Sequence, residues 1–425
     1  MKILAADHVL PVSSEPIAKG AVAIDGSTIT AVGSRDDLMR QFPEARVSDF
    51  GSAAILPGFV NCHSHLEITA MRGALDSVEH DFRSWLLKLN EIRTGLTPDE
   101  IEGFAIVGAT EGARAGVTCF GDIGRFGEHG LRALKQVGLR GVVFQETEFS
   151  PDNSTAESDF AKLQKKFESL RADETELVEV GLSPHSPYTV SRRLFELITD
   201  FCIGGNIKLT VHAAESADED ALVLRGEGFF TDFYKRMDLA WDVPGCPPIE
   251  FLSRTGVLRA KPLLAHCVTV SDSDLELIRS SGSTIAHCPK SNAKFGHGFA
   301  PFEKFLDLGI LVGLGSDSMA SNNLCDLLEE SRFAVLAARN RPDRKRFISS
   351  HEVLEAATLG GAKALGLDQK IGTLEVGKEA DIAVVSLTSA AQTPVNDVEN
   401  ALVFSSNARA VVATFVGGGE VFRSR

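Results

Sequence analysis

The stretch Phe59-Val60-Asn61-Cys62-His63-Ser64-His65 joins a short apolar run to two histidines that are two residues apart. On a β-strand such side chains point to the same face, so both imidazoles would reach one site. The stretches His212-Ala213-Ala214-Glu215 and Ser316-Asp317-Ser318 also follow apolar, strand-like runs. Together they supply enough imidazoles and acids to hold a divalent metal and catalyse a hydrolysis.

The middle of the chain, residues 56–367, alternates apolar runs with helical patterns. Eight apolar runs end near Cys62, Phe120, Phe144, Leu182, Val211, Ala265, Ala286 and Gly315. Helical patterns between them include residues 104–115, 161–170, 192–201 and 271–280. Strands that alternate with helices predict a parallel sheet, and eight units predict an α/β fold of the (β/α)8 TIM-like barrel type. An open doubly wound sheet is the alternative, but no GxGxxG motif follows the first strand.

Both ends of the chain differ from this middle, because short β-like runs and turn signals dominate there. The Asp25-Gly26 pair between two apolar runs predicts a hairpin. Gly417-Gly418-Gly419 follows another apolar run near the end of the chain. We therefore expect residues 1–56 and 370–425 to form one small β domain, and residues 57–369 to form the catalytic barrel.

The composition is typical of a globular protein, with 425 residues of which 44% are hydrophobic and 24% charged. The net charge of −15 would repel phosphate backbones and anionic membrane surfaces, so we expect neither nucleic acid nor membrane as a partner. No stretch approaches the roughly 20 apolar residues of a membrane span. Seven scattered cysteines without a CxxC pair indicate free thiols in a reducing compartment, and we expect a cytoplasmic protein.

Nitrogen and oxygen ligands for a metal are expected at the barrel rim from His63, His65, His212 and Asp317. Such a set suits one divalent metal, Zn2+ in the first place and Fe2+ as the alternative. Glu215 lies three residues beyond His212, where it could relay a proton from a water molecule to the substrate. A solvated acid at a helix start is the alternative for Glu215. His266 ends another strand and could polarise the water or hold a developing oxyanion.

Several further residues are candidates for substrate contact. His185 ends a strand within a loop that two prolines make rigid, and Trp85 and Trp241 follow predicted strand ends on the active-site side. The long connection at residues 219–248 carries five aromatic side chains. It is either a lid that stacks on an aromatic substrate or a helical hairpin that packs its aromatics against the barrel. Arg72 could pair with a substrate carboxylate, and Arg83 and Arg225 are further candidates for that role.

These residues resemble the amidohydrolase superfamily over nearly the whole chain. The resemblance rests on residues 57–65, His212 with Glu215, residues 264–267, residues 287–292, Gly315-Ser316-Asp317 and residues 372–381. It implies a barrel with a small β-sandwich domain built from both termini, and one metal on the four ligands named above. In the branch of adenosine-type, guanine and triazine deaminases and chlorohydrolases, Asp317 and His266 would activate the water. Glu215 would protonate the ring nitrogen and then the departing ammonia.

A narrower resemblance joins the chain to the aminodeoxyfutalosine deaminases of the menaquinone route. It rests on residues 63–67, 82–86, 212–216 and 317–322. Deaminases of S-adenosylhomocysteine and methylthioadenosine usually carry an acid beside the tryptophan equivalent to Trp85, whereas this chain has Arg83-Ser84 there. A carboxylated aromatic nucleoside would match Arg72 beside aromatic side chains, so the expected substrate is 6-aminodeoxyfutalosine, a small molecule of the purine nucleoside type.

Other functions remain open at this point. A deaminase of adenosine, S-adenosylhomocysteine, methylthioadenosine or guanine is one alternative, and a triazine chlorohydrolase or deaminase is another. A barrel that has lost catalysis and serves as a binding protein is disfavoured, because it would not need the whole catalytic set.

The strand at residues 177–182 lacks the terminal lysine that a bridging carbamate requires, so we expect one metal. The HxE…PCxxC pattern of cytidine-type deaminases is absent. A homodimer would be in keeping with the superfamily.

Overall fold

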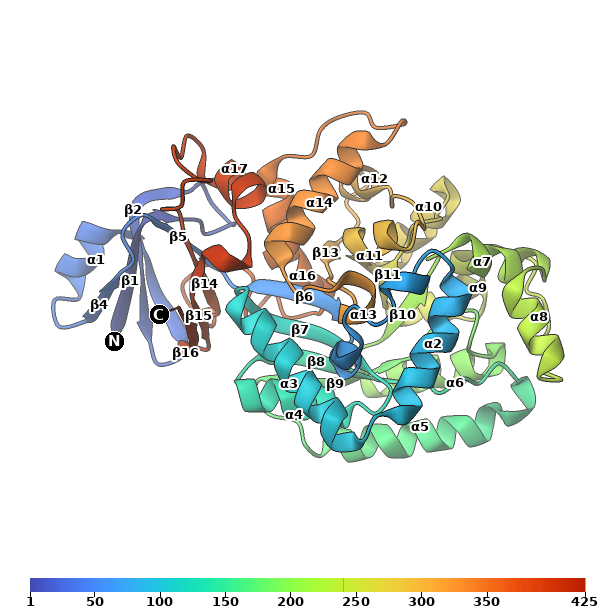
Figure 1. Ribbon diagram of the computed structural model, residues 1–425. Helices are drawn as coiled ribbons and strands as arrows, with labels where there is room; N and C mark the ends of the chain where they lie inside the picture. The colour runs from blue at the N-terminus through green and yellow to red at the C-terminus, as the bar shows by residue number, and fades with distance from the viewer. Residues whose placement is uncertain (240, 425) are drawn as a thin grey trace.

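Eight parallel strands close into a barrel in the computed structural model, which describes residues 1–239 and 241–424 (Figure 1). The barrel strands are β6 (Phe59–Ser64), β7 (Val117–Gly124), β8 (Arg140–Glu146), β9 (Val178–Ser183), β10 (Thr210–Ala213), β11 (Leu263–His266), β12 (Thr284–His287) and β13 (Val312–Leu314). They pair in chain order as two four-stranded halves. Parallel bridges join the halves, Leu182 to Leu209 on one side and Ser64 to Asp317 on the other. The predicted barrel is therefore confirmed, and the open sheet is wrong.

The barrel strands are buried, which explains their apolar sequences. Every residue of β6, β7 and β8 is buried. A parallel strand that is covered on both faces reads as a continuous apolar run instead of an alternating one. For this reason each of the eight predicted strand ends falls within one of these strands or directly beside it.

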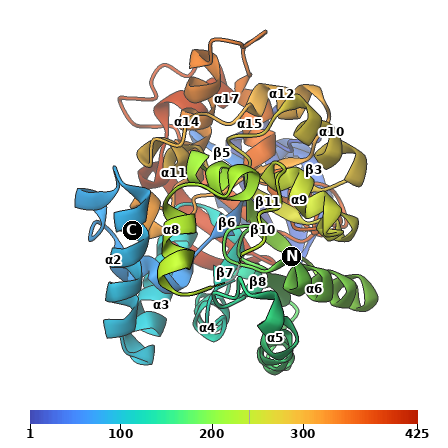
Figure 2. The ribbon, with the colours of Figure 1, turned by 90° about the vertical axis from the view of Figure 1, so that its right-hand side faces the viewer.

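Helices surround the barrel strands, as the view along the barrel shows (Figure 2). They are α2 (Phe82–Gly95), α3 (Pro98–Arg114), α4 (Glu128–Val137), α5 (Ala156–Arg171), α6 (Arg192–Gly205), α7 (Ala217–Asp220), α8 (Phe229–Arg236), α9 (Pro248–Arg254), α10 (Asp272–Ser281), α11 (Pro289–Lys294), α12 (Phe302–Asp307), α13 (Met319–Asn322), α14 (Leu327–Asn340), α15 (Ser350–Glu355), α16 (Gly361–Ala364) and α17 (Val398–Asn400). The four predicted helical segments overlap α3, α5, α6 and α10. Among the described residues, no helix combines the length and apolarity that crossing a membrane requires.

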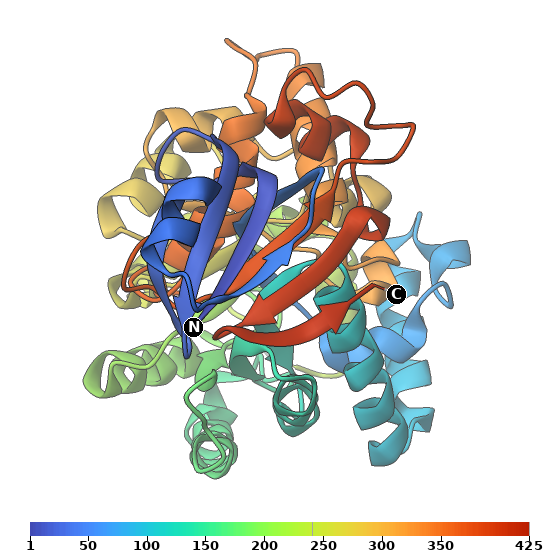
Figure 3. The same ribbon diagram turned by 90° about the vertical axis from the view of Figure 1, so that its left-hand side faces the viewer.

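Both ends of the chain contribute to one eight-stranded sheet beside the barrel (Figure 3). Its strands are β1 (Lys2–Val9), β2 (Ile17–Asp25), β3 (Thr28–Ser34), β4 (Arg46–Asp49), β5 (Ala53–Pro57), β14 (Ile382–Ser386), β15 (Val411–Val416) and β16 (Gly419–Arg423), and helix α1 (Arg35–Gln41) follows β3. Strand β5 pairs with β1 and with β14, which joins the two chain ends. The β2–β3 hairpin turns at Gly26 with a φ of +57°, as the Asp-Gly pair predicted. The terminal β-rich part is thus one continuous hydrogen-bonded sheet.

A buried ion pair connects this sheet to the barrel. Arg140, the first residue of β8, donates from Nε to Asp381 Oδ2 at 2.9 Å and from a terminal nitrogen to Oδ1 at 3.1 Å. Both side chains are almost fully buried. Asp381 also accepts a hydrogen bond from the Gly417 backbone, just beyond β15. The barrel and both chain ends therefore share one polar anchor at the amino-terminal side of β8.

Candidate metal centre and active site

Three histidines and one aspartate from separate strands meet at the carboxyl end of the barrel. His63 lies in β6 with His65 directly after it, His212 lies in β10, and Asp317 follows β13. The Asp317 Oδ1 atom lies 3.5 Å from Nε2 of His63 and 3.5 Å from Nε2 of His65. The Nε2 atoms of His65 and His212 are 3.2 Å apart. The structure thus brings the four predicted ligands to one place, where two groups that could each hold a metal ion share His63: His63 with His65 and His212, and His63 with His266 and Asp317.

The hydrogen bonds around this cluster leave its ring nitrogens free to bind a cation. His65 donates from Nδ1 to the Ile123 carbonyl at 3.1 Å, and His212 donates from Nδ1 to the His185 carbonyl at 2.9 Å. Because a carbonyl oxygen only accepts, the proton of each neutral imidazole lies on Nδ1 and the facing Nε2 atoms carry lone pairs. Two lone pairs at 3.2 Å repel each other unless a cation lies between them. The residues present therefore fit a divalent metal.

Asp317 is held in place by hydroxyl groups and by a strained backbone. Its Oδ2 atom accepts hydrogen bonds from Ser291 Oγ at 2.5 Å and from Ser321 Oγ at 2.7 Å, which leaves Oδ1 for the histidines. The φ angle of Asp317 is +57°, and that of His266 is +74°. Left-handed φ angles are costly for residues other than glycine and are concentrated at functional sites. The fold therefore maintains strained backbone conformations at these two positions, and they place the side chains of Asp317 and His266 at the site.

Glu215 and His266 lie together beside the ligand cluster. The Glu215 Oε1 atom is 3.7 Å from His266 Nε2, and the Tyr188 hydroxyl donates to Oε2 at 3.4 Å. Burial raises the pKa of Glu215 to about 7, with His297 opposing the rise and Asp317 adding to it. His266 donates from Nδ1 to Asn292 Oδ1 at 2.9 Å, so its Nε2 atom can accept a proton. The pair can hold and exchange protons near neutral pH. The predicted alternative of a solvated acid does not describe Glu215, which is buried.

His297 joins this group although the sequence did not point to it. Its Nε2 atom lies 3.8 Å from Glu215 Oε1, and the ring stacks on Phe295 with centroids 5.1 Å apart. The residue is presented by a loop between α11 and α12 in which Gly296 and Gly298 both have positive φ angles. The only sequence signal is the Gly-His-Gly pattern a few residues after the His287–Asn292 stretch.

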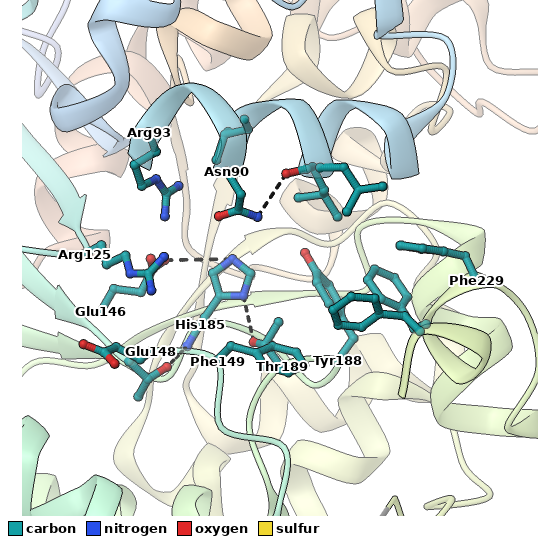
Figure 4. Close-up of a pocket in the computed structure, with 16 residues that line it drawn as sticks. Asn90, Arg93, Arg125, Glu146, Glu148, Phe149, His185, Tyr188, Thr189 and Phe229 are labelled. Carbon is teal, nitrogen blue, oxygen red and sulfur yellow. Dashed lines mark hydrogen bonds and ion pairs between the residues drawn. The ribbon is translucent and has the colours of Figure 1, made fainter. Parts of the chain in front are cut away.

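A pocket of about 340 Å³ lies between α2 and α8, and His185 forms part of its wall (Figure 4). The His185 ring centre is 4.8 Å from that of His212, so one residue of the pocket wall packs beside the histidine–aspartate cluster. The wall combines aromatic side chains with a group of charged ones, namely Phe149, Phe229, Phe230, Phe233, Arg93, Arg125 and Glu146. A pocket of this size and mixed lining is typical of a small-molecule site.

The long connection at residues 219–248, described except for residue 240, provides the α8 side of the pocket. Phe229, Phe230 and Phe233 line the pocket, and Phe230 also stacks on Tyr188 with ring centres 4.6 Å apart. Trp241 packs on Tyr234, one layer behind the pocket wall. The segment therefore combines both expected arrangements, since some of its aromatics pack inward and others face the pocket.

The remaining predicted substrate contacts lie at different distances from the site. Trp85 is buried in α2 and packs edge-on against Phe295, with ring centres 4.9 Å apart, in the aromatic wall that supports His297. Arg72 is turned away from the pocket, where it forms an ion pair with Glu111 of α3. Its guanidinium is already engaged by a carboxylate, so the structure provides no support for its predicted role.

A (β/α)8 barrel with a histidine–aspartate cluster at the carboxyl ends of its strands defines a class of metal-dependent hydrolases. Residues 54–421 match the amidohydrolase family, and a short second match, at residues 20–45, is to an imidazolonepropionase-like composite domain of bacteria. The chain belongs to the amidohydrolase family. It is 30% identical over 403 residues to a 5-methylthioadenosine/S-adenosylhomocysteine deaminase of Pyrococcus furiosus, covering 95% of this chain and 90% of the relative.

Solved structures share this architecture. An adenosine deaminase from Xanthomonas campestris with bound zinc superposes with a TM-score of 0.85 at 25% identity, covering 98% of this chain and 92% of that one. The Helicobacter pylori aminofutalosine deaminase in complex with methylthio-coformycin gives a TM-score of 0.83 at 22% identity, covering 99% of this chain and 100% of that one. At that identity the second likeness shows the fold alone.

Proposed function

We propose that this protein is a zinc-dependent deaminase of adenine nucleosides, with 6-aminodeoxyfutalosine as the leading substrate. The observation that carries the proposal is the buried Glu215 carboxyl group, whose raised pKa of about 7 lets it donate a proton beside the ligand cluster. Similarity to a 5-methylthioadenosine/S-adenosylhomocysteine deaminase supports nucleoside deamination, and similarity to a zinc-bound adenosine deaminase supports zinc as the metal. The motifs at residues 63–67, 82–86, 212–216 and 317–322 support the narrower substrate.

Zinc fits the donor set, which consists of three imidazole nitrogens and one carboxylate oxygen, and Fe2+ is the alternative. His63, His65, His212 and Asp317 would hold the ion. When bound there, a divalent metal supplies a Lewis acid that makes water nucleophilic near neutral pH. His63 agrees with this role, because it is fully buried and neither of its ring nitrogens has a hydrogen-bond partner among the described residues.

The side chains of the site can carry out the proton transfers of a hydrolytic deamination. Water adds its oxygen to the ring carbon that bears the amino group, and His266 Nε2 with Asp317 accepts the proton that the water loses. Glu215 holds a proton at neutral pH and delivers it to the adjacent ring nitrogen, which removes the aromatic barrier to addition. The hydroxyl group of the adduct passes its proton to Glu215, which delivers it to the amino group. The carbon–nitrogen bond then breaks, ammonia leaves and the ring retains a carbonyl oxygen. The proton held at His266 returns to Glu215, 3.7 Å away, which restores both groups.

A second candidate is a deaminase of methylthioadenosine or S-adenosylhomocysteine. It is favoured by the relative that matches 95% of this chain. Both candidates use the same chemistry and differ in the group attached to the ribose. The protein can therefore discriminate between these substrates only through the residues of the pocket wall that contact this group.

The test is ammonia release by the zinc-loaded protein from a panel of substrates. The panel contains 6-aminodeoxyfutalosine, adenosine, S-adenosylhomocysteine, methylthioadenosine, guanine and melamine, with Asp317→Asn as the inactive control. We expect the highest kcat/KM for 6-aminodeoxyfutalosine and loss of turnover after chelation, with recovery on adding zinc. Preference for methylthioadenosine would select the second candidate. Chloride release from a chlorinated triazine without turnover of any nucleoside would overturn the proposal.

A further inference from the structure

Two arginines project into the pocket without a carboxylate partner. Arg93 comes from α2 and Arg125 follows the last residue of β7, and both line the pocket beside Glu146 (Figure 4). The two arginines also line a small adjoining cavity that reaches the metal ligand His65. Among the described residues neither guanidinium forms an ion pair, and Arg93 Nε is buried without any hydrogen-bond partner.

Three other arginines near the barrel have carboxylate partners. Arg72 pairs with Glu111, Arg132 pairs with Glu102, and Arg140 pairs with Asp381. Taking a guanidinium out of water is costly unless an anion compensates it, so an unpaired one at a pocket wall indicates a missing anionic partner. The anionic partner of the Arg93 and Arg125 guanidinium groups would therefore come from a bound molecule and not from the protein.

The acids near the two arginines form no ion pair with them among the described residues. Glu146 is the one buried acid in the pocket wall, and its Oε1 atom lies 3.9 Å from His185 Nε2 with no hydrogen bond to either arginine. Burial raises the pKa of Glu146 to about 7, although Arg93 and Arg125 oppose the rise. Glu148 also lines the pocket, but Lys166 pairs with it at 2.9 Å. Glu67 is buried and lines the small adjoining cavity, but its carboxylate accepts hydrogen bonds from the backbone of Phe126 and Gly127. Among the described residues, none of these three acids forms an ion pair with either guanidinium.

We propose that Arg93 and Arg125 form a subsite for an anionic oxygen group on the substrate, a carboxylate or a phosphate. Guanidinium groups recognise both through paired N–H donors in a planar fork. Phe149, Phe229 and Phe233 line the same pocket, so the substituent that carries the anion also has an apolar part. The inference rests on the proposed function, because it places the anion on the nucleoside that is deaminated. It assigns to Arg93 and Arg125 the role that the sequence suggested for Arg72.

The experiment compares pairs of substrates in which one member carries the anionic group and the other does not. The zinc-loaded protein and the variants R93M and R125M are assayed with 6-aminodeoxyfutalosine and its methyl ester, and with adenosine 5′-monophosphate and adenosine. Methionine removes the charge but keeps an unbranched stem. The control is K88M, because Lys88 is an exposed cation on the same helix as Arg93 and does not line the pocket.

We expect R93M and R125M to lower kcat/KM for the anionic member of one pair by about 10- to 100-fold, the range for losing a charge-assisted hydrogen bond. For the neutral member we expect a change below about threefold, and for K88M no change in the acid-to-neutral ratio. A loss confined to the carboxylate pair identifies a carboxylate subsite, and a loss confined to the phosphate pair identifies a phosphate subsite. Equal losses for charged and neutral members, or no loss at all, would overturn the proposal.

Failure of the subsite and failure of the proposed function can be told apart. Turnover of the neutral nucleosides tests the deaminase, whereas the acid-to-neutral ratio tests the subsite. If no nucleoside is turned over, calorimetric binding of the acid and the ester to the unmodified protein and to R125M still measures that ratio. Retained thermal unfolding midpoints of R93M and R125M exclude misfolding as the cause of a loss.

Discussion

Glu215 shows how burial changes the chemistry of one residue. A solvated glutamate is ionised at neutral pH, but here burial raises the pKa to about 7. Tyr188, His266 and His297 surround the carboxyl group, so both of its oxygens face groups that can exchange or orient a proton. A catalytic acid is most effective when its pKa lies near the working pH. The residue is therefore suited to donate a proton in neutral solution.

The pH dependence of the reaction should report this carboxyl group. Because Glu215 must be protonated to act as an acid, we expect kcat/KM to fall as the pH rises through about 7. In Glu215→Gln we expect kcat to fall by about 10²- to 10⁴-fold and the limb near pH 7 to disappear. The measurement is a pH–rate profile with metal content determined in parallel. A limb that persists in the variant would assign it to another group.

His297 is predicted to assist Glu215 through its ring nitrogen. In His297→Phe the stack on Phe295 is kept but the nitrogen that faces Glu215 is lost, and we expect kcat to fall about 10-fold or more. His297→Ala should lower kcat to a similar degree and should also raise KM. His351→Ala, at an exposed residue on α15, is the control. Wild-type kcat in His297→Phe would mean that the ring serves only as an aromatic wall.

At the scale of elements, the ends of the barrel strands carry the reactive groups and the helices form the pocket wall. The candidate metal ligands and His266 lie at or just beyond the carboxyl ends of strands β6, β10, β11 and β13. The positions of these residues along the sequence could therefore be predicted from the strand pattern. The pocket itself lies between α2 and α8, which are separated by more than a hundred residues in sequence. Figure 2 shows α8 beside α2 at the open side of the barrel. Substrate selection therefore depends on two helices that the barrel strands do not define.

Helix α8 should affect binding more than catalysis. Phe233 lines the pocket and is partly exposed, so Phe233→Ala removes an aromatic contact without opening the barrel core. We expect KM to rise by about 3- to 12-fold with kcat nearly unchanged, which corresponds to the energy of one aromatic pair. Phe347→Ala, at an exposed phenylalanine away from the pocket, is the control. A fall in kcat with unchanged KM would contradict this division of roles.

At the scale of the whole molecule, closing the barrel brings the first and last ligands together. The bridge between Ser64 and Asp317 sets residues more than 250 positions apart side by side. The terminal sheet is attached through strand β5, which runs directly into β6, and through the buried Arg140–Asp381 pair. The metal ligands on β6 are thus connected to a domain that contributes no side chain to the site.

The Arg140–Asp381 pair should be important for stability. Asp381→Asn removes the buried counter-charge of Arg140 and leaves only the partly exposed Glu379 carboxylate, 3.7 Å away, so we expect the free energy of unfolding to fall by up to about 3–5 kcal/mol. The measurement is urea unfolding at neutral pH. Glu420→Gln, which removes an exposed partner of Arg423, is the matched control and should cost less than about 1 kcal/mol. A similar small change in both variants would show that water reaches Arg140.

The sequence alone determined the barrel and its eight strands, and it identified the four candidate metal ligands that the fold brings together. Buried parallel strands must be apolar, and residues at their carboxyl ends must meet at one rim, so both features leave a local pattern. His63 and His65 are recognisable because they share a strand, and His212 and Asp317 because each follows one. Local physics and topology were sufficient for these residues.

Only the tertiary structure decided which other side chains reach the site. Arg72 and Arg93 both follow the first barrel strand, yet Glu111 binds Arg72 while Arg93 remains free in the pocket. His297 reaches Glu215 because a glycine-flanked loop turns it inward. Loop conformation and the pairing of long charged side chains depend on neighbours that are distant in sequence, and no periodicity records them. The metal site could therefore be read along the chain, whereas the substrate pocket appeared only once the chain was folded.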